Sequence, residues 1–249
     1  MIYSCASHTG KVRKNNEDYC GGEFIDTSLG SIGIFALADG MGGHKKGEVA
    51  SKLAVDNIIK FLKDNLVQNN NIKIDYIDDI IKQAYNNVNL IIYDKSINNI
   101  EYEGMGTTLT TAIIYKDLLY VANVGDSRCY LLKDNKFSQI TVDHSVVQEL
   151  IEAKIITEEE AKNHPRRNHI TRAIGTDELV IVDIFKHKIN VGDKILLATD
   201  GLVGFVDDKI IKDTINKNEE ISNLTQELID VANEISGKDN VSVILIEEK

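Results

Sequence analysis

Cysteine is scarce in this sequence, and its few copies are poorly spaced for cross-linking or zinc binding. The three cysteines, Cys5, Cys20 and Cys129, are odd in number and far apart, and no C-x-x-C pair occurs. A disulfide framework needs paired cysteines and a structural zinc site needs closely spaced ones, so the pattern argues against both. Low cysteine content fits a reducing cytoplasm, where we expect the protein to act.

The chain also lacks a surplus of basic residues and any long apolar run. It carries 28 Lys and Arg against 39 Asp and Glu, a net charge of −11, so no basic excess can replace the counterions of a nucleic acid. No apolar segment approaches the length that crosses a bilayer. The N-terminal residues contain no apolar signal-like stretch, and Ile2 rather than glycine follows Met1. We therefore expect neither nucleic-acid binding nor stable membrane insertion.

Linker-like stretches and internal repeats are absent as well, and the single proline, Pro165, lies in a polar segment. A chain of 249 residues with 43% hydrophobic residues can build a sizeable core. These features predict one domain over residues 1–249.

Several motifs of covalent and nucleotide chemistry are missing. The C-x5-R motif of thiolate phosphatases does not occur, because Lys11, Asp26 and Asn135 stand six residues after the three cysteines. No G-x-S-x-G elbow occurs, and Gly47 is followed by Glu48 rather than by the lysine of a phosphate-binding loop. The glycine-rich stretch at 40–47 also lacks the G-x-G-x-x-G spacing of dinucleotide-binding proteins.

The hydrophobic patterns that are present predict an α+β fold. Apolar residues recur with helical spacing in one group of segments and as short strand-like runs in another, with tight turns between several of the runs. Tight turns imply antiparallel pairing, so the simplest architecture has two sheets face to face with helices outside. The expected strands are 2–8, 32–38, 107–115, 118–125, 127–134, 179–186, 194–199 and 241–248, and the expected helices are 50–62, 77–92, 207–216 and 222–235, with a polar, helical-looking insert at 143–172.

Acidic residues stand at the ends of several apolar runs. Asp39, Asp126 and Asp200 each follow such a run, Asp39 and Asp200 are followed by glycine, and Asp239 precedes the last run. A single Asp-Gly is ordinarily a turn. If the strands are neighbours, however, the carboxylates converge, and crowded carboxylates repel one another unless a cation neutralises them. Ligation by oxygen alone favours Mg²⁺ or Mn²⁺, so the pattern leaves a metal site and ordinary turns both open.

Such a site is suited to phosphate chemistry. Two hard cations can share a bridging hydroxide and hold a phosphate for in-line attack. Arg13 stands four residues before Glu17, where its guanidinium could clamp the phosphoryl oxygens, although a surface arginine is the ordinary alternative.

Seven motifs in a fixed order resemble those of metal-dependent protein phosphatases of the PPM (type 2C) family, and the bacterial single-domain branch is the most similar. The resemblance covers essentially all 249 residues. The motifs are GKVRKNNED, ALADGMGGHKKGEVAS, GMGTTLTTAII, ANVGDSRCYLL, HPRRNHITRAIG, LLATDGL and KDNVSVILI. The family implies a four-layer α-β-β-α sandwich, two antiparallel sheets flanked by helix pairs. It also implies hydrolysis of phosphoserine and phosphothreonine in proteins by direct attack of a metal-bridging water or hydroxide.

The resemblance implies ligands for two Mn²⁺ or Mg²⁺ ions. Asp39 would bridge both ions, Asp200 and Asp239 would complete one site, and Glu17 with the Gly40 carbonyl would hold the other, mostly through waters.

It further implies a weaker third metal site and two catalytic residues. Asp126 with Asp200 are the candidates for the third ion, with Asn168 a weaker one. Arg13 would bind substrate phosphate, and Asp18 would order metal-bound water.

One departure from the family concerns the general acid. Many animal relatives have histidine directly after the Asp-Gly pair, whereas this chain has Met41 there and His44 three residues further on. His44 is therefore a candidate catalytic residue, its alternative being a loop or helix-start residue. The insert at 143–172 resembles the family's flap beside the active site, and we expect it to be hinged and to influence substrate choice.

The resemblance implies phosphorylated proteins as partners, and a membrane-anchored, eukaryotic-type Ser/Thr protein kinase of a bacterium that this enzyme would oppose. We expect a monomer. A phosphatase of small phosphomonoesters remains an alternative function. A non-catalytic regulatory relative is a further alternative, disfavoured because such proteins usually lose metal ligands.

Overall fold

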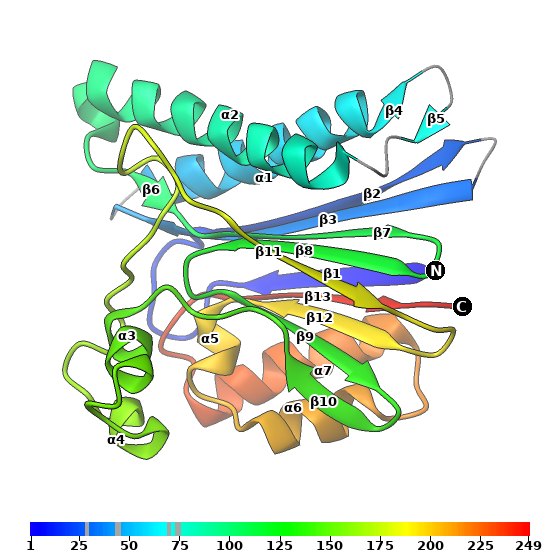
Figure 1. Ribbon diagram of the computed structural model, residues 1–249. Helices are drawn as coiled ribbons and strands as arrows, with labels where there is room; N and C mark the ends of the chain where they lie inside the picture. Colours follow the sequence, from blue (N-terminus) through cyan, green and yellow to red (C-terminus); the bar gives the residue numbers. More distant parts are fainter. Residues whose placement is uncertain (28–29, 43–45, 69–70, 73–75) are drawn as a thin grey trace.

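Two antiparallel β-sheets pack face to face in the computed structural model of the chain (Figure 1). The structure describes residues 1–249 except 28–29, 43–45, 69–70 and 73–75. In spatial order, the first sheet consists of β1 (Ile2–His8), β13 (Val241–Glu247), β12 (Lys194–Ala198), β9 (Arg128–Lys133) and β10 (Lys136–Gln139). The second sheet consists of β11 (Asp183–Lys188), β8 (Leu118–Val124), β7 (Leu109–Tyr115), β3 (Gly30–Met41) and β2 (Asp18–Thr27), and β6 (Gly106–Thr107) pairs with the end of β3.

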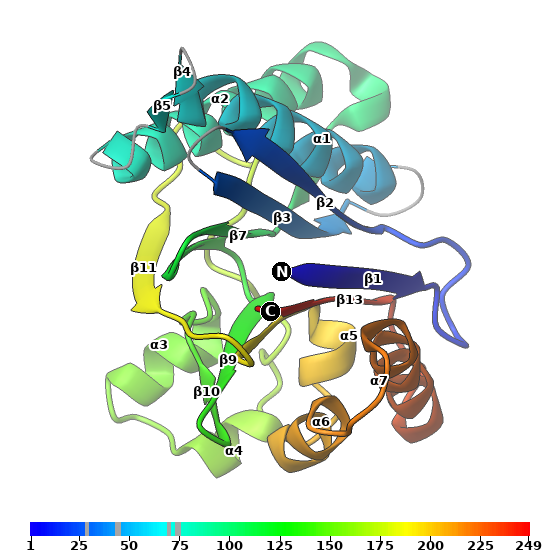
Figure 2. The ribbon, with the colours of Figure 1, turned by 90° about the vertical axis from the view of Figure 1, so that its right-hand side faces the viewer.

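Helices cover the outer face of each sheet (Figure 2). The second sheet is covered by α1 (Lys46–Leu66) and α2 (Ile77–Asn98), and the first by α5 (Asp200–Val203), α6 (Asp208–Ile215) and α7 (Ile221–Ile235). A short hairpin, β4 (Val67–Gln68) and β5 (Asn71–Ile72), follows α1, and a 3-10 turn, η2 (Ile100–Tyr102), follows α2. The predicted α+β sandwich with helix layers outside two antiparallel sheets is confirmed.

Strand β3 is buried on both faces and aims alternate side chains into two different cores. Phe35 and Leu37 pack between the sheets, whereas Ile34 and Ala36 pack under the helices. Because side chains alternate along a strand, the next residue of the inward set is Asp39. The same alternation that fills the inter-sheet core therefore brings a carboxylate to the end of the space between the sheets.

Strand β2 was not predicted from the sequence, because Gly21 and Gly22 weaken its strand pattern. The structure gives Gly22 a packing reason. A Cβ atom there would lie 2.4 Å from Cδ1 of Phe35, so the glycine makes room for this buried ring. The strand expected at 179–186 was placed too early, since β11 begins at Asp183.

The insert at 143–172 leaves the sandwich beside α5 and contains α3 (Val146–Glu152) and α4 (Glu158–Lys162) (Figure 1). Ser145 caps α3, and a capping box at Thr157 starts α4. An isolated bridge between Ser145 and Ile170 brings the two ends of the insert together. None of the helices in the described ranges has the length and apolar character required to span a bilayer.

Candidate metal centre

The acidic residues singled out in the sequence meet at one end of the sandwich. Asp18 opens β2 directly opposite Asp39 near the end of β3. Asp200 begins α5 just after β12, and it lies close enough to Asp39 for its charge to raise the pKa of Asp39. Asp126 lies between β8 and β9, close enough to Asp39 to perturb it electrostatically. These carboxylates come from both sheets, so the site depends on how the sheets pack.

Hydrogen bonds from the segment 107–108 fix the backbone of Asp39. The Asp39 N–H donates to Thr108 Oγ1 at 2.9 Å, and the Thr108 N–H donates back to the Asp39 carbonyl at 2.8 Å. Thr107 Oγ1 also donates to that carbonyl at 2.8 Å. The Thr-Thr pair of the GMGTT motif therefore holds the position of the central carboxylate.

The loop between β1 and β2 brings Arg13 and Glu17 to the same place. Arg13 Nη2 lies 2.8 Å from Oδ2 of Asp239, and half of the arginine side chain is exposed. Asn240 Oδ1 accepts the Glu17 N–H at 2.8 Å, while Asn240 Nδ2 donates to the carbonyls of Thr9 and Asn15. Asn240 therefore ties this loop to the start of β13.

Close backbone contacts explain the glycines after Asp39. The Gly40 N–H donates to the Glu17 carbonyl at 3.0 Å. A Cβ on Gly40 would lie 2.1 Å from the carbonyl oxygen of Gly47, and a Cβ on Gly47 would lie 2.9 Å from Cδ of Glu17. Only glycine at both positions allows β3, the Glu17 carboxylate and the start of α1 to approach so closely.

Burial and mutual repulsion disfavour the charged forms of these carboxyl groups. Burial, followed by the charges of neighbouring carboxylates, raises the pKa of Asp39 well above its ordinary value. Burial is also the main cause that raises the pKa of Asp18 to about 7, of Asp126 to about 8 and of Asp200 to about 6. Asp18 is almost fully buried, whereas Asp39, Asp126 and Asp200 keep some exposed surface. An added cation would favour the ionised forms of all four groups.

Unused oxygen atoms show that the cluster fits a hard cation. Within the described residues, Oδ1 of Asp18 and Oδ1 of Asp200 are buried and have no hydrogen-bond partner. Buried polar atoms are normally paired, and carboxylate oxygens are the donors that Mg²⁺ and Mn²⁺ prefer. Among the described residues, no three His, Cys, Asp or Glu side chains are positioned to bind one metal ion without further ligands. Ligation would therefore need water molecules and backbone carbonyls to complete it, as is usual for Mg²⁺.

A cavity of about 750 Å³ lies between the carboxylates and the insert. Asp126, Asp200 and Asp239 line one part of it, and Asn168 and Arg167 of the insert line another. The structure thus brings Asn168 to the same cavity as the proposed third-ion ligands. His44 lies outside the described residues, so its position is not part of this geometry.

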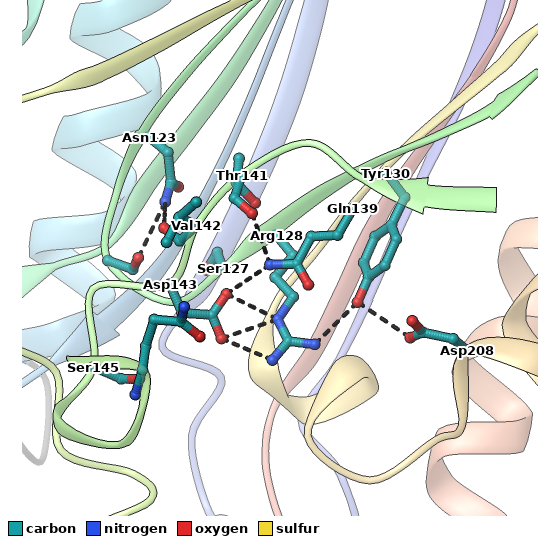
Figure 3. A network of polar contacts seen from close by, with 12 residues as sticks. Asn123, Ser127, Arg128, Tyr130, Gln139, Thr141, Val142, Asp143, Ser145 and Asp208 are labelled. Carbon is teal, nitrogen blue, oxygen red and sulfur yellow. Dashed lines mark hydrogen bonds and ion pairs between the residues drawn. The ribbon is translucent and has the colours of Figure 1, made fainter. Parts of the chain in front are cut away.

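Arg128, next to the site, anchors the beginning of the insert (Figure 3). Its guanidinium donates to both carboxylate oxygens of Asp143, at 2.7–3.0 Å, and to Tyr130 Oη at 3.0 Å. Tyr130 Oη in turn donates to Asp208 at the start of α6. Ser127 Oγ lies 2.8 Å from Thr108 Oγ1. Ser127 and Arg128 therefore hold the strand end.

Sequence reasoning missed several residues that position the site, above all Asn240 and Thr199. Thr199 Oγ1 donates to Oδ2 of Asp18 at 2.9 Å and accepts the Ser242 N–H at 2.9 Å. The sequence could have indicated both residues by their position next to a candidate ligand, because Asn240 directly follows Asp239 and Thr199 directly precedes Asp200.

Comparison with known proteins gives consistent matches over nearly the whole chain. A family model described as Protein phosphatase 2C matches residues 6–244. The serine/threonine phosphatase stp of Listeria welshimeri is 38% identical over 240 residues, which cover 96% of this chain and 92% of that protein. The crystal structure of the serine/threonine phosphatase Stp1 from Staphylococcus aureus has a TM-score of 0.89 at 36% identity and covers 99% of this chain and 94% of that one.

A further solved structure bears on the metal. The catalytic domain of the serine/threonine protein phosphatase PstP, described in complex with two manganese ions, has a TM-score of 0.83 at 33% identity. The match covers 99% of this chain and 97% of that one. The chain therefore belongs to the protein phosphatase 2C (PPM) family and is a bacterial serine/threonine protein phosphatase.

Proposed function

We propose that this phosphatase hydrolyses phosphoserine and phosphothreonine in proteins by direct attack of water at the acidic cluster, which would hold two Mn²⁺ or Mg²⁺ ions. The observation that carries the proposal is the meeting of Asp39, Asp200 and Asp239 at one end of the sandwich, beside Arg13. When bound, such ions supply a nucleophilic water at neutral pH and positive charge opposite the phosphoryl oxygens. The proposed ligands are Asp39, Asp200, Asp239, Glu17 and the Gly40 carbonyl, with Asp126 and Asp200 for a weaker third ion.

Arg13 is proposed to bind the substrate phosphate. Its guanidinium is half exposed and is held beside the cluster by Asp239. A planar guanidinium can donate two parallel hydrogen bonds to a phosphate, which fixes the phosphorus atom as well as attracting its charge. The salt bridge to Asp239 thus orients the arginine before the substrate arrives.

Asp18 is proposed to orient the attacking water through a hydrogen bond. One of its oxygens is occupied by Thr199, and the other is buried without a partner among the described residues. A carboxylate with one oxygen held by a side-chain donor keeps its other oxygen in a fixed direction as an acceptor, which is what the orientation of a water molecule requires.

The proton for the leaving serine or threonine oxygen has two candidate sources. His44 is one, and water in the cavity is the other, since Met41 cannot supply a proton. His44→Ala discriminates between them. If this variant keeps the wild-type rate and pH profile, His44 has no catalytic role.

The insert is proposed to contribute to substrate choice, because Arg167 and Asn168 line the cavity beside the acidic cluster. Exchange of residues 143–172 for the insert of a relative should change the order of preference among phosphopeptides. Unchanged preferences would contradict this part of the proposal. The physiological substrates are proposed to be proteins phosphorylated by a bacterial Ser/Thr kinase.

The main test is hydrolysis of a phosphothreonine peptide with and without Mn²⁺, comparing wild type with Asp239→Asn. We expect Mn²⁺-dependent, EDTA-sensitive turnover in the wild type and a loss on the order of 10²-fold or more in the variant. Asp230→Asn is the matched control, because Asp230 is exposed on α7 and the chemical change is the same.

Two results would overturn the proposal. One is metal-independent turnover that Asp239→Asn leaves intact. The other is strong preference for a small phosphomonoester when it competes with the phosphopeptide, which would favour the alternative substrate class.

A further inference from the structure

Two of the three cysteines, distant in the sequence, meet at one edge of the sandwich. Strands β1 and β2 are edge strands of the first and second sheets, and they contact each other where the two edges meet (Figure 2). Cys5 lies on β1 and Cys20 on β2. The cysteine spacing in the sequence gives no sign of this pair, because the two residues meet only through the fold.

The side chains of both cysteines face the space between the sheets. Cys5 pairs with Ile244 of β13, which belongs to the inter-sheet core. Cys20 packs against the same core. Both residues therefore belong to the inward set of their strands.

Contacts beside the cysteines show how the two strands are aligned. Tyr3 Oη donates to the Gly22 carbonyl at 2.7 Å, and the Tyr3 ring packs against Phe24 with centroids 5.5 Å apart. Cys5 lies two residues after Tyr3 on β1, and Cys20 lies two residues before Gly22 on β2. Each cysteine is therefore on the same face of its strand as the neighbouring contact residue. The two side chains lie close enough for each thiol to shift the pKa of the other.

The two thiols differ in exposure and in acidity. Cys5 is exposed, whereas Cys20 is partly buried. The interaction with Cys20 lowers the pKa of Cys5 to about 7, and the same interaction, together with burial, raises the pKa of Cys20. An accessible thiol with thiolate character beside a second thiol is the arrangement found in redox-sensitive cysteine pairs.

We propose that Cys5 and Cys20 form an oxidation site, in which a hydroperoxide converts the two thiols into an intrachain disulfide that joins the two sheets. The Cys5 thiolate attacks the peroxide, the O–O bond breaks, and Cys5 becomes a sulfenic acid as an alcohol or water leaves. Cys20 then attacks the Cys5 sulfur, the S–O bond breaks, and water leaves. In total, two thiols and one hydroperoxide give one disulfide, one alcohol (or water) and one water, so the two sulfurs lose the two electrons that the peroxide gains.

The bridge would close a loop that carries Arg13, Glu17 and Asp18. This is the segment that we propose to bind phosphate and metal, so the oxidation state of the cysteines would act on the part of the chain that completes the site. The thiol chemistry itself does not depend on the proposed function, because thiols can be counted on protein that is not turning over.

The test is thiol counting on the full chain after brief exposure to hydrogen peroxide at neutral pH, with unreacted thiols alkylated after unfolding. The wild type should fall from three free thiols to one. The remaining thiol should be Cys129, which is fully buried in the inter-sheet core and serves as an internal control. A peptide map should show a Cys5–Cys20 cross-link, and a thiol reductant should restore all three thiols.

Serine variants separate the two roles. Cys5→Ser should slow the loss of the Cys20 thiol about 10-fold or more, because the accessible nucleophile is gone. Cys20→Ser should stop at a Cys5 sulfenic acid that a dimedone probe captures. The proposal is overturned if the wild type keeps three thiols, if Cys5 cross-links only between molecules, or if Cys5→Ser loses the Cys20 thiol at the wild-type rate. The wild-type peptide map decides the question even if a variant folds poorly.

Discussion

Replacing Asp200 with asparagine should stabilise the metal-free protein and abolish most of its stabilisation by Mn²⁺. Burial, with added repulsion from Asp239, raises the pKa of Asp200 from 3.8 to about 6. The folded state therefore holds more protons than the unfolded state between about pH 4 and pH 6. The stability that Asp200 contributes is therefore fully present below the unfolded pKa and is lost as the pH rises through the folded pKa. At pH 7 the ionised Asp200 destabilises the metal-free fold.

The size of the effect follows from the shift. A rise from 3.8 to about 6 corresponds to about 3 kcal/mol at a pH above both values. Asp200 lines an open cavity, and its neighbours can relax, so solvent screening should reduce the gain to about 1–2 kcal/mol. For a chain of this length, that corresponds to a rise in Tm of about 2–8 °C.

The assay is thermal unfolding of wild type and Asp200→Asn at pH 7.5, each with EDTA and with excess Mn²⁺. The variant should be more stable in EDTA, whereas the wild type should be more stable in Mn²⁺, because a ligand at 100 times its Kd contributes about 2.7 kcal/mol. Asp230→Asn, an exposed change on α7, should shift neither curve by more than about 0.5 kcal/mol. A variant that is less stable than wild type in EDTA, or that gains as much from Mn²⁺, would refute the electrostatic reasoning.

Three further substitutions test other parts of the site. Arg13→Lys keeps the charge but loses the planar guanidinium, so kcat/KM for a phosphopeptide should fall about 10-fold. The Mn²⁺-induced shift in Tm should persist. An unchanged kcat/KM would contradict phosphate binding by Arg13. Thr108→Val removes the acceptor of the Asp39 N–H and should lower the free energy of unfolding in urea by about 1–3 kcal/mol. Gly40→Ala would place a Cβ atom 2.1 Å from the Gly47 carbonyl oxygen. It should destabilise the fold by at least about 3 kcal/mol, and wild-type stability in the same urea titration would show that the contact relaxes easily.

Local patterns predicted most of the fold because most elements carry their own signal. Lys116, Asp134 and Asn135 all adopt positive φ, at the tight turns where the sequence predicted hairpins. Apolar residues at helical spacing predicted α1, α2, α6 and α7. Strand β2 was missed because its character comes from packing against Phe35 and pairing with β3, which are properties of the assembled sandwich rather than of residues 18–27.

The site was predictable to the extent that its residues stand at strand ends. Asp39 and Asp200 could be recognised in the sequence as acids that end an apolar run, and the structure brings them close enough for the charge of Asp200 to raise the pKa of Asp39. The contact of Arg128 with Asp143 could not be predicted from the sequence, because Asp143 lies at the start of a different segment. The Cys5–Cys20 contact likewise could not be read from spacing, since it requires the packing of one sheet on the other.

Strand register links the stability of the core to the chemistry of the site. Phe35, Leu37 and Asp39 belong to one alternating set, so a slip of one residue would turn Asp39 towards the helices and remove it from Asp18 and Asp200. The free energy gained by burying the two apolar side chains, about 1.5–3 kcal/mol each, therefore also holds the carboxylate in a place where it repels its neighbours. Since this repulsion is comparable in size to the burial of one such side chain, the fold can tolerate the cluster only because many core residues enforce the same register. A bound cation would convert the repulsion into binding energy without any change in register.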